Sequence, residues 1–546
     1  GNISFALAEE VTITDGGTGL FADAASGSAG AGGSIAVTTP GIQVSNGAAI
    51  AVDSRGRGPG GSINLNARSV NLTTGGAITA TAASSGSGGN IDLQGEQLTA
   101  TQGGQIRTTA SSAGPAGNIR IGLTGDLNLS DANTGLFADT AAGSTGSGGS
   151  ILASVRHLQL AQSAAISADS RGSGSGGSID LQTRSLNLTT GGAITATAAG
   201  QGSGGSIAIR GQQFTASQGG QIRTTASNAG QAGNIQLALT GDLNLTDAGT
   251  GLFANTRLGS TGNGGSIFVA ARDMTINNAA AISVDSDGSG QGGSIDLQGR
   301  RLSLSDRGLI TAETASAQGG DITLTFRDLL VMRRNSLISA TAGTAQAGGD
   351  GGNIRITTPF IISVLSEDND IRANAFTGRG GQITINALGI FGLRFRPSNT
   401  PFSDITASSQ FGLSGTVTLN TLNVDPNRGL VSLPLNFADA SSRISQTCVA
   451  HGKNRGRFVV TGPGGLPTTP FESGSDRTLT SLAEPIDTPQ TAVRPEPTPP
   501  ATATTPAIIE AQSMAIAPDG SIQLITSALA PQGQSPWAPS VSCPEP

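Results

Sequence analysis

The 546-residue chain contains few aromatic and few basic side chains. Aromatic residues make up 3% of it, tyrosine does not occur, and Lys453 is the only lysine. The charged residues, 12% in all, form no basic stripe and are not interleaved with aromatic rings. Because nucleic-acid binding depends on such clusters, no nucleic-acid partner is predicted. An ordinary globular core is not predicted either, given so few large aromatic side chains.

Long apolar runs are also missing. No stretch of about 18 apolar residues occurs, so the sequence predicts no transmembrane segment. The chain starts at Gly1 rather than at Met and shows no signal peptide. We therefore expect a processed or truncated N-terminus, from which any targeting segment would have been lost.

Cysteine and histidine occur twice each. Cys448 and Cys543 both lie in the C-terminal part. In an oxidising compartment they are predicted to form a disulfide, and the alternative is two buried free thiols. His157 and His451 have no Cys, His or carboxylate at metal-ligand spacing, and they support no Ser-His-Asp arrangement. The sequence thus predicts no metal site, no cofactor and no catalytic residues.

Glycine is abundant, with 82 residues, and much of it recurs at a fixed spacing. A glycine-rich segment ending in Ser-Ile or Asn-Ile returns at steps of 28 or 32 residues, and the whole pattern repeats every 116. Its isoleucines are Ile35, Ile63, Ile91, Ile119, Ile151, Ile179, Ile207, Ile235, Ile267 and Ile295, with looser copies at Ile322, Ile354, Ile383 and Val417. Such periods are typical of solenoids and propellers. A propeller is disfavoured because aromatic blade signatures and a fourth strand per repeat are missing.

Each repeat holds three short runs of alternating apolar and polar residues, as at 62–65, 70–72 and 78–82. Such alternation predicts strands, and the frequent glycines disfavour helices. We predict an all-β fold, a right-handed parallel β-helix (solenoid) of about 14 three-stranded coils of 28–32 residues, over residues 1–445. The paired glycines should permit positive φ angles and close passage where the chain enters the first strand. The third run places one inward aliphatic per coil: Leu20, Ile50, Ile78, Ile106, Leu136, Ile166, Ile194, Ile222, Leu252, Ile282, Ile310, Ile338, Ile371 and Ile405.

The C-terminal sequence is not repetitive. Residues 446–471 are predicted to form a cap or transition, and residues 472–508, rich in Pro, Thr and Ala, an extended linker. Residues 509–546 are predicted to form a β-hairpin, with a turn at 518–520, and a tail that folds back. This capping segment would cover the open strand edge of the last coil.

The coils of 32 residues share the corner sequence TGLFAD or TGLFAN, which contains Phe21, Phe137 and Phe253 at intervals of 116. These rings alternate with the inward leucines, so they are expected to face outward. One interpretation is a phenylalanine packed under its own longer loop. The other is an evenly spaced row of docking residues along one edge of the solenoid, roughly 19 Å apart.

Asp53, Asp169 and Asp285 are the nearest approach to a catalytic group in this sequence, because some parallel β-helices cleave polysaccharides with clustered carboxylates. These three residues lie four coils apart, about 19 Å, whereas paired carboxylates act across roughly 5–9.5 Å. We interpret them as turn residues before a glycine-rich corner. Arg107 and Arg223, also 116 apart, are interpreted as members of a surface ladder.

The repeats, the segment LNLTTGGAITATA and the C-terminal tail together carry a family resemblance. The tail contains Cys448, GRFVVTGPGGLP at 456–467, IIEAQSMAIAPDGSIQLI at 508–525, Trp537 and Cys543. Over essentially its whole length the chain resembles the C-terminal repeat portion of cyanobacterial filamentous-haemagglutinin-like exoproteins, two-partner-secretion substrates sometimes labelled S-layer family proteins. The resemblance implies secretion through a partner outer-membrane pore. The family's secretion domain and signal peptide lie N-terminal to such repeats and are absent from this chain, and its repeat region transfers no catalytic residues.

Three functions follow as hypotheses. The first is a secreted, non-enzymatic rod of the cell surface or extracellular matrix, with a structural or adhesive role and with surface glycans or other cells as partners. The second is a subunit that assembles into an extracellular filament by end-to-end stacking of solenoids. The third is a β-helix that binds or degrades polysaccharides.

Overall fold

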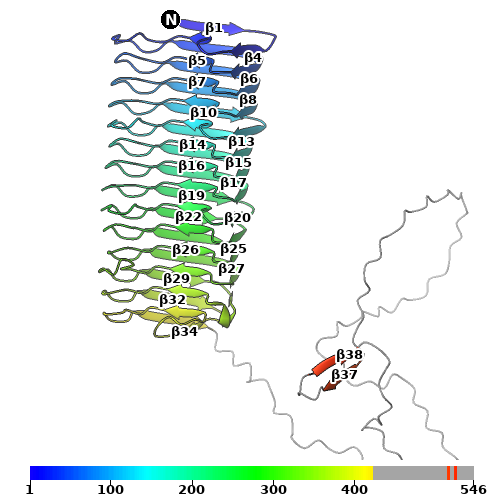
Figure 1. The fold of residues 1–546 in the computed structure, drawn as a ribbon, viewed down its shortest axis with the longest axis vertical. Coiled ribbons are helices and arrows are strands. Elements are labelled where there is room, and N and C mark those ends of the chain that lie inside the picture. The colour runs from blue at the N-terminus through cyan, green and yellow to red at the C-terminus, as the bar shows by residue number, and fades with distance from the viewer. Residues whose placement is uncertain (422–512, 517–521, 526–546) are drawn as a thin grey trace, which may run out of the picture. The chain divides into compact units, whose positions relative to one another are not determined.

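The computed structural model describes residues 1–421, 513–516 and 522–525. The chain divides into two units, Gly1–Leu433 and Pro434–Pro546, and each is considered by itself. The first unit is a solenoid of about 14 turns, in which successive coils stack on one another in parallel (Figure 1). The predicted parallel β-helix is therefore confirmed. In the part of the chain that the structure describes, the only helical element is one 3-10 turn, η1 (Leu365–Glu367).

Two sheets form the walls of the solenoid. The long-strand sheet has 21 strands and the short-strand sheet has 15. The long-strand sheet comprises β1 (Asn2–Ala6), β2 (Val11–Thr14), β4 (Ser34–Ser45), β6 (Ser62–Leu72), β8 (Asn90–Ala100), β10 (Asn118–Leu123), β11 (Asp126–Ser130), β13 (Ser150–Ala161), β15 (Ser178–Leu188), β17 (Ser206–Ala216), β19 (Asn234–Leu239), β20 (Leu243–Thr246), β22 (Ser266–Ala270), β23 (Asp273–Asn277), β25 (Ser294–Ser305), β27 (Asp321–Met332), β29 (Asn353–Thr357), β30 (Phe360–Ile362), β32 (Gln382–Ala387), β33 (Gly389–Phe391) and β36 (Thr416–Thr421). The short-strand sheet comprises β3 (Gly19–Phe21), β5 (Ala49–Ala51), β7 (Ala77–Thr79), β9 (Gln105–Arg107), β12 (Gly135–Phe137), β14 (Ala165–Ser167), β16 (Ala193–Thr195), β18 (Gln221–Arg223), β21 (Gly251–Phe253), β24 (Ala281–Ser283), β26 (Leu309–Thr311), β28 (Leu337–Ser339), β31 (Asp370–Arg372), β34 (Arg394–Phe395) and β35 (Asp404–Thr406).

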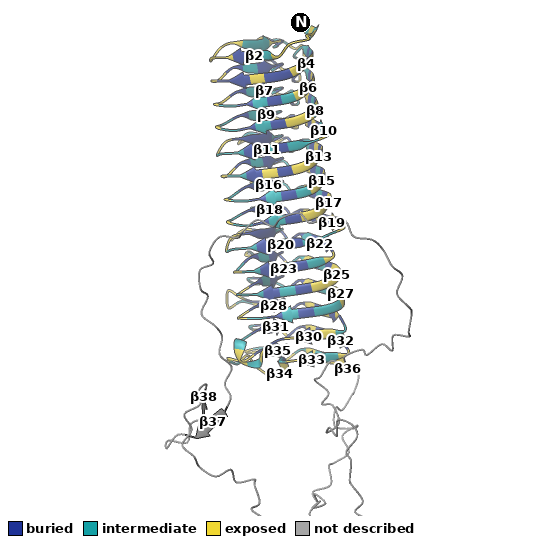
Figure 2. Ribbon diagram, turned by 90° about the vertical axis from the view of Figure 1, so that its right-hand side faces the viewer, coloured by how far each residue is buried: buried dark blue, intermediate teal, exposed yellow. Residues whose placement is uncertain are grey.

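The core is a set of aliphatic columns that run along the solenoid axis. The predicted column of the third run is confirmed, because Leu20 pairs with Ile50 at one end and Ile371 with Ile405 at the other. In the long-strand sheet Ile35 pairs with Ile63 in the same way. These side chains form one continuous buried cluster (Figure 2). Each fully buried Ile or Leu contributes on the order of 1.5–3 kcal/mol.

The first two predicted runs form a single strand in many coils. In β6 the inward positions are Ile63 and Leu65 before a bend and Val70 and Leu72 after it. The strand keeps the same register on both sides of the bend, and only the pair at Arg68 is missing from the ladder. These coils therefore have one long bent strand, one short strand and a loop, whereas in others, such as the coil of β10 and β11, the long strand is divided in two.

The loops between each short strand and the next long strand form a layer that we call the loop stack. Within a coil, the N–H of Gly61 donates to the carbonyl of Val52 at 2.7 Å and closes the base of the loop. Between coils, the N–H of Gly60 donates to the carbonyl of Ser87 at 2.9 Å. A Cβ atom on Gly61 would lie 2.0 Å from the carbonyl oxygen of Gly33. The expected close passage at the paired glycines is thus confirmed.

Positive φ angles occur elsewhere than predicted. Gly60 and Gly61 do not have them, so that part of the prediction is wrong. The turn between the long and the short strand has them instead, at Thr74 (φ 48°) and Gly75 (φ 75°), and Thr190 and Gly191 repeat the pattern. Two successive left-handed residues reverse the chain tightly, which glycine tolerates best.

The four extra residues of a 32-residue coil are spread over three places. Comparing the coil that starts at Asn118 with the preceding one, one residue is added at the bend, one at the turn and two in the loop stack. All inward columns keep their register, because Ile119 still pairs with Ile91 and Ile151. Length variation is therefore absorbed where no core side chain is displaced.

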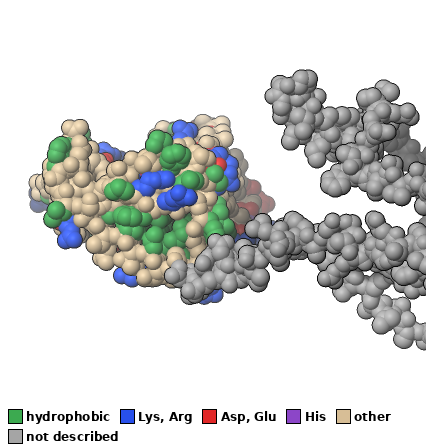
Figure 3. Space-filling view, turned by 90° about the horizontal axis from the view of Figure 1, so that it is seen from below, with side chains coloured by type: hydrophobic (Ala, Val, Ile, Leu, Met, Phe, Trp, Pro, Cys, Tyr) green, Lys and Arg blue, Asp and Glu red, His purple; other side chains and the backbone are tan. Residues whose placement is uncertain are grey.

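The C-terminal end of the described solenoid exposes apolar side chains (Figure 3). Phe391 is 56% exposed and Phe411 is 68% exposed. The others are Phe360, Ile362, Val364, Leu388, Phe395, Phe402, Leu413 and Leu419. The strand β34 pairs with β35 at this end of the short-strand sheet. In the long-strand sheet a groove of about 680 Å³ opens between Pro359, Leu388 and Leu419.

In the second unit the structure describes one antiparallel pair, β37 (Ser513–Ile516) and β38 (Ile522–Ile525). The predicted hairpin strands are confirmed. The predicted turn at 518–520, the cap at 446–471 and the linker at 472–508 lie outside the described residues.

Candidate functional site

The outward face of the short-strand sheet carries most of the unusual side chains, and we call it the short-strand face. It consists of the last residue of each short strand and the residues two and four positions later. Phe21, Phe137 and Phe253 are on this face, because each ends its strand beside an inward leucine. Phe21 is 46% exposed on the first coil, whereas Phe137 and Phe253 are half-buried.

Phe137 and Phe253 lie over glycines of their own strands. The tip of each ring would lie 3.1 Å from a Cβ atom at Gly135 or Gly251. On the neighbouring coil, the guanidinium of Arg107 lies over the ring of Phe137, 5.6 Å from its centroid. Arg223 pairs with Phe253 at the equivalent position. Arg107 therefore contacts the phenylalanine row, and Arg223 lies opposite Phe253 in the strand register.

Carboxylates on this face form pairs between adjacent coils, which the sequence analysis missed. The backbone N–H of Asp53 donates to Asp23 at 2.9 Å, and that of Asp169 donates to Asp139 at 2.8 Å. Asp23 and Asp139 belong to the TGLFAD corners, 30 residues before their partners. Aligning each TGLFAD corner with the corresponding segment of the next coil would have placed each aspartate beside its partner. The separation of about 19 Å holds only between equivalent residues of successive 116-residue repeats.

Asp53, Asp169 and Asp285 precede the glycine-rich loops as predicted, but they are not turn residues. Each follows a short strand, and its carboxylate accepts a backbone N–H of the next coil: Thr81 at 2.7 Å, Thr197 at 2.6 Å and Glu313 at 2.7 Å. The side-chain oxygen takes the place of a ladder carbonyl. These aspartates therefore hold adjacent coils together.

Two carboxyl groups on this face, those of Asp139 and Glu313, have raised pKa values. Burial, and next the charge of Asp169, raises the pKa of Asp139 to about 6. Burial, and next the charge of Asp285, raises the pKa of Glu313 to about 7. Asp139 nevertheless has three donors, the Ser167 hydroxyl at 2.5 Å, the Asp169 N–H at 2.8 Å and the Arg171 guanidinium at 3.1 Å. Both of its oxygens are occupied by the protein itself.

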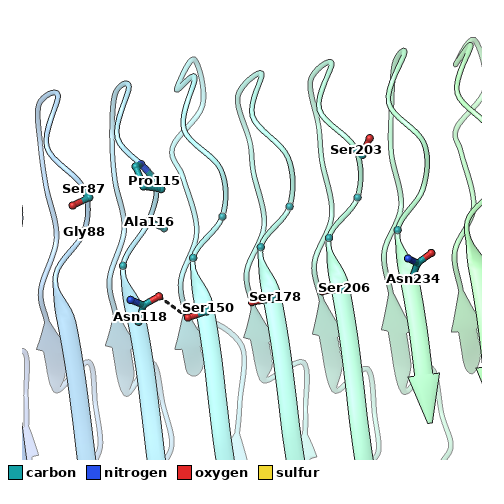
Figure 4. Close-up of a pocket in the computed structure, with 18 of the residues that line it drawn as sticks. Ser87, Gly88, Pro115, Ala116, Asn118, Ser150, Ser178, Ser203, Ser206 and Asn234 are labelled. Atoms are coloured by element: carbon teal, nitrogen blue, oxygen red, sulfur yellow. Dashed lines mark hydrogen bonds between the residues drawn. The ribbon is translucent and has the colours of Figure 1, made fainter.

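A second candidate surface is a groove between the loop stack and the long-strand sheet. It has a volume of about 800 Å³ and is lined by glycine backbone and by serine and asparagine side chains. Ser150, Ser178 and Ser206 line it on three successive coils (Figure 4). A further stretch of about 370 Å³ continues along the later coils. Hydroxyl and amide groups in a row can hydrogen-bond the hydroxyls of a sugar polymer, and Asp321 is the single carboxylate among the residues that line the two stretches.

His157 is exposed on β13, and its Nδ1 lies 2.6 Å from the Ser185 hydroxyl oxygen. Cys448 and Cys543 lie outside the described residues. Within the described ranges, no group of three or more His, Cys, Asp or Glu side chains could hold a metal ion. In the same residues no helix is long and apolar enough to cross a membrane.

In comparisons with known proteins, the sequence matches no family model, and neither a curated protein nor a solved structure matches it. The resemblance to filamentous-haemagglutinin-like exoproteins stays a prediction.

Proposed function

We propose that this chain is a structural and adhesive rod of the cell surface or extracellular matrix. The observation that carries the proposal is the repetition of the short-strand face. The pair of Arg107 and Phe137 recurs as Arg223 and Phe253, 116 residues later and in the same register. Four coils separate the copies by about 19 Å. A rigid rod that presents one feature at regular intervals can bind a repetitive partner with high avidity, even where each contact is weak.

A non-enzymatic role is part of the proposal. Neighbouring carboxylates are the arrangement that glycan-cleaving β-helices would need. Here the carboxylate of Asp139 accepts from three protein donors, and Asp285 and Asp169 accept backbone N–H groups. A general base must be free to accept a proton from its substrate or from water. Assays for reducing-sugar release from neutral and acidic polysaccharides test this part, and turnover would overturn it.

Adhesion is tested with beads coated with the full chain and exposed to cells or to immobilised glycans. Replacing Phe21, Phe137 and Phe253 together by alanine should lower bead retention if the phenylalanine row is the docking edge. A matched control replaces Gln43, Gln159 and Thr275 by alanine, because these outward residues of the long-strand sheet have the same spacing of 116. Equal retention of all three proteins excludes the phenylalanine row, and the absence of retention for all of them excludes adhesion.

End-to-end assembly into a filament is a second candidate. The exposed apolar side chains at the C-terminal end of the described solenoid favour it, since an end-to-end contact would bury surface of this kind. Phe411, Phe391 and Phe395 are the most exposed phenylalanines there. Electron microscopy of the purified full chain tests it. Continuous filaments support assembly, and single rods at high concentration contradict it.

A further inference from the structure

The short-strand face forms a pocket of about 410 Å³ on the coils of β28, β31 and β35. Its lining includes the residues two and four positions after each of these strands: Thr341 and Gly343, Asn374 and Phe376, and Ser408 and Gln410. On several earlier coils the first of these positions is acidic, as at Asp139 and Glu313. The volume is within the range of roughly 300–1,000 Å³ that is typical of small-molecule pockets.

The turn at 392–403, between β33 and β35, adds a wall to this part of the face. It contributes Pro397 and Ser398 to the pocket lining. The fully buried carboxylate of Asp404 fixes the turn, because it accepts the N–H of Thr400 at 2.6 Å and the Thr400 hydroxyl at 2.8 Å. The wall is therefore held by hydrogen bonds to the short-strand sheet.

Asn374 connects this wall to the face of the sheet. Its amide group donates to the side-chain oxygen of Asn399 at 3.2 Å. Its own oxygen accepts the backbone N–H of Ser408 at 2.8 Å and the Ser408 hydroxyl at 3.1 Å. The backbone contact is the one that Asp139 makes to Asp169, here made by an uncharged amide. The pocket thus keeps the ladder between coils without placing a carboxylate in its lining.

The residues that line the pocket are all uncharged. The charged side chains of the adjoining strands and turn are paired with one another, Arg372 with Asp370 and Arg396 with Asp404. A charged ligand group would find no counter-ion in the lining, and burying an unpaired charge is costly. The pocket therefore favours an uncharged ligand.

The lining combines an apolar ring with accessible polar groups. Phe376 is half-buried, and the ring of Phe411 packs against it edge-on, with the two centroids 5.1 Å apart. Ser398 and Gln410 are exposed, so their hydroxyl and amide groups are accessible to a ligand. A ligand that fits has one apolar side and several hydrogen-bonding groups.

We propose that this pocket binds an uncharged sugar residue of a neutral glycan. The C–H face of the sugar ring packs on Phe376, because the electron-rich face of an aromatic ring attracts polarised C–H groups. The sugar hydroxyls hydrogen-bond the Gln410 amide and the Ser398 hydroxyl, which can both donate and accept. The site lies on the short-strand face but shares no residue with the phenylalanine row. It goes beyond the proposed adhesive function and does not depend on it.

The test is saturation-transfer NMR of the full chain with the methyl glycosides of glucose, galactose and mannose, and with the charged sugars galacturonate and glucosamine. At least one neutral glycoside should bind, and more tightly than either charged sugar. Phe376→Ala should lower its affinity about tenfold, and Gln410→Ala about three- to tenfold, the contribution of one neutral hydrogen bond. The matched controls are Phe391→Ala and Gln382→Ala, at exposed residues of the long-strand sheet, and both should bind like the wild type.

The outcomes separate the pocket from the wider function. Binding of none of the neutral glycosides would overturn the proposal, and so would tighter binding of galacturonate or glucosamine. Equal losses for Gln410→Ala and Gln382→Ala would show that the sugar binds elsewhere. A selective loss in Gln410→Ala at an unchanged melting temperature supports the site, even if Phe376→Ala does not fold. If wild-type beads are not retained by cells or glycans but a neutral glycoside binds, adhesion is excluded and the pocket stands.

Discussion

The carboxylate of Asp139 accepts the backbone N–H of Asp169 on the next coil at 2.8 Å, while the carbonyl of Asp169 accepts the N–H of Thr140 at 2.9 Å. One half of this ladder step is made by backbone and the other half by a side chain. Asn255 makes the same contact to Asp285 at 2.9 Å, with an amide oxygen instead of a carboxylate. The contact therefore requires an oxygen acceptor but no charge. Replacing Asp139 by Asn should therefore keep this contact. The charge of Asp139 is available to pair with Arg171.

The same reasoning predicts the effect of changing Asp53. Its carboxylate accepts the Thr81 N–H at 2.7 Å and the Thr79 hydroxyl at 3.1 Å. Asp53→Ala leaves both donors without their acceptor and should lower the free energy of unfolding by about 1–3 kcal/mol. Asp53→Asn retains an oxygen at the same place and should cost clearly less. Urea denaturation followed by circular dichroism measures both, and equal losses would contradict an acceptor role.

Glu313 predicts a pH-dependent stability. Its pKa is raised to about 7 by burial and by Asp285, whereas an unfolded glutamate titrates at about 4.3. The folded state holds this proton more tightly, so stability should fall as pH rises from about 4 to about 7. At pH 8 the Glu313→Gln variant should be more stable than the wild type by about 3–4 kcal/mol, and at pH 4 the difference should vanish.

Melting temperatures between pH 4 and pH 8 measure this effect. Asp139, with its pKa raised to about 6, adds a loss of the same sign at somewhat lower pH, and this loss remains in the variant. Glu9→Gln, at an exposed position on the first coil, is the control and should follow the wild-type curve. A Glu313→Gln curve parallel to the wild type over the whole range would show that the burial of this carboxyl has no thermodynamic effect.

The inward columns could be predicted from the sequence because burial imposes one apolar residue at a fixed place in every coil. Leu20 and Ile405, at the two ends of the predicted column, both belong to it. The carboxylate pairs could not be predicted from the repeat length alone. Asp23 and Asp53 are 30 residues apart, a spacing between the 28 and 32 of the repeat, because the extra residues of a long coil are spread over three places. The contacts on the outward face depend on where those residues are accommodated, and outward side chains are not constrained by burial.

The joining of the first two runs into one bent strand could not be predicted from the sequence either. Alternation is interrupted at residues 67–70 whether the chain turns a corner or only bends. The positive φ angles at Thr74 and Gly75 were also not predictable from the sequence, since Thr at such a position is uncommon. By contrast, the glycines before the long strands could be assigned to close passage, because a Cβ atom there would meet the backbone of the preceding coil.

The loop stack predicts a severe effect for Gly86→Ala. A Cβ atom at this position would lie 2.1 Å from the carbonyl oxygen of Gly58 on the preceding coil. Since that atom is backbone, relief requires the two coils to separate, and we expect a loss of about 1–3 kcal/mol. Gly16→Ala is the matched control, because its nearest atom would be 3.9 Å away. Chemical denaturation compares them, and a Gly86→Ala variant as stable as Gly16→Ala would show that the stack is loosely packed.

The core columns predict the largest effect, for Ile179→Asp on β15. Ile179 is 1% exposed and pairs with Ile151 and Ile207 on the coils before and after it. An unpaired carboxylate there lacks solvation, and three coils lose their contact, so the loss should exceed about 4 kcal/mol. Gln182→Asp introduces the same charge on the same strand, at an exposed residue, and should change stability by less than about 0.5 kcal/mol. Limited proteolysis locates the damage: cleavage should increase at the coils around residue 179, and a protease-resistant Ile179→Asp protein with wild-type melting would refute the inward placement of this column.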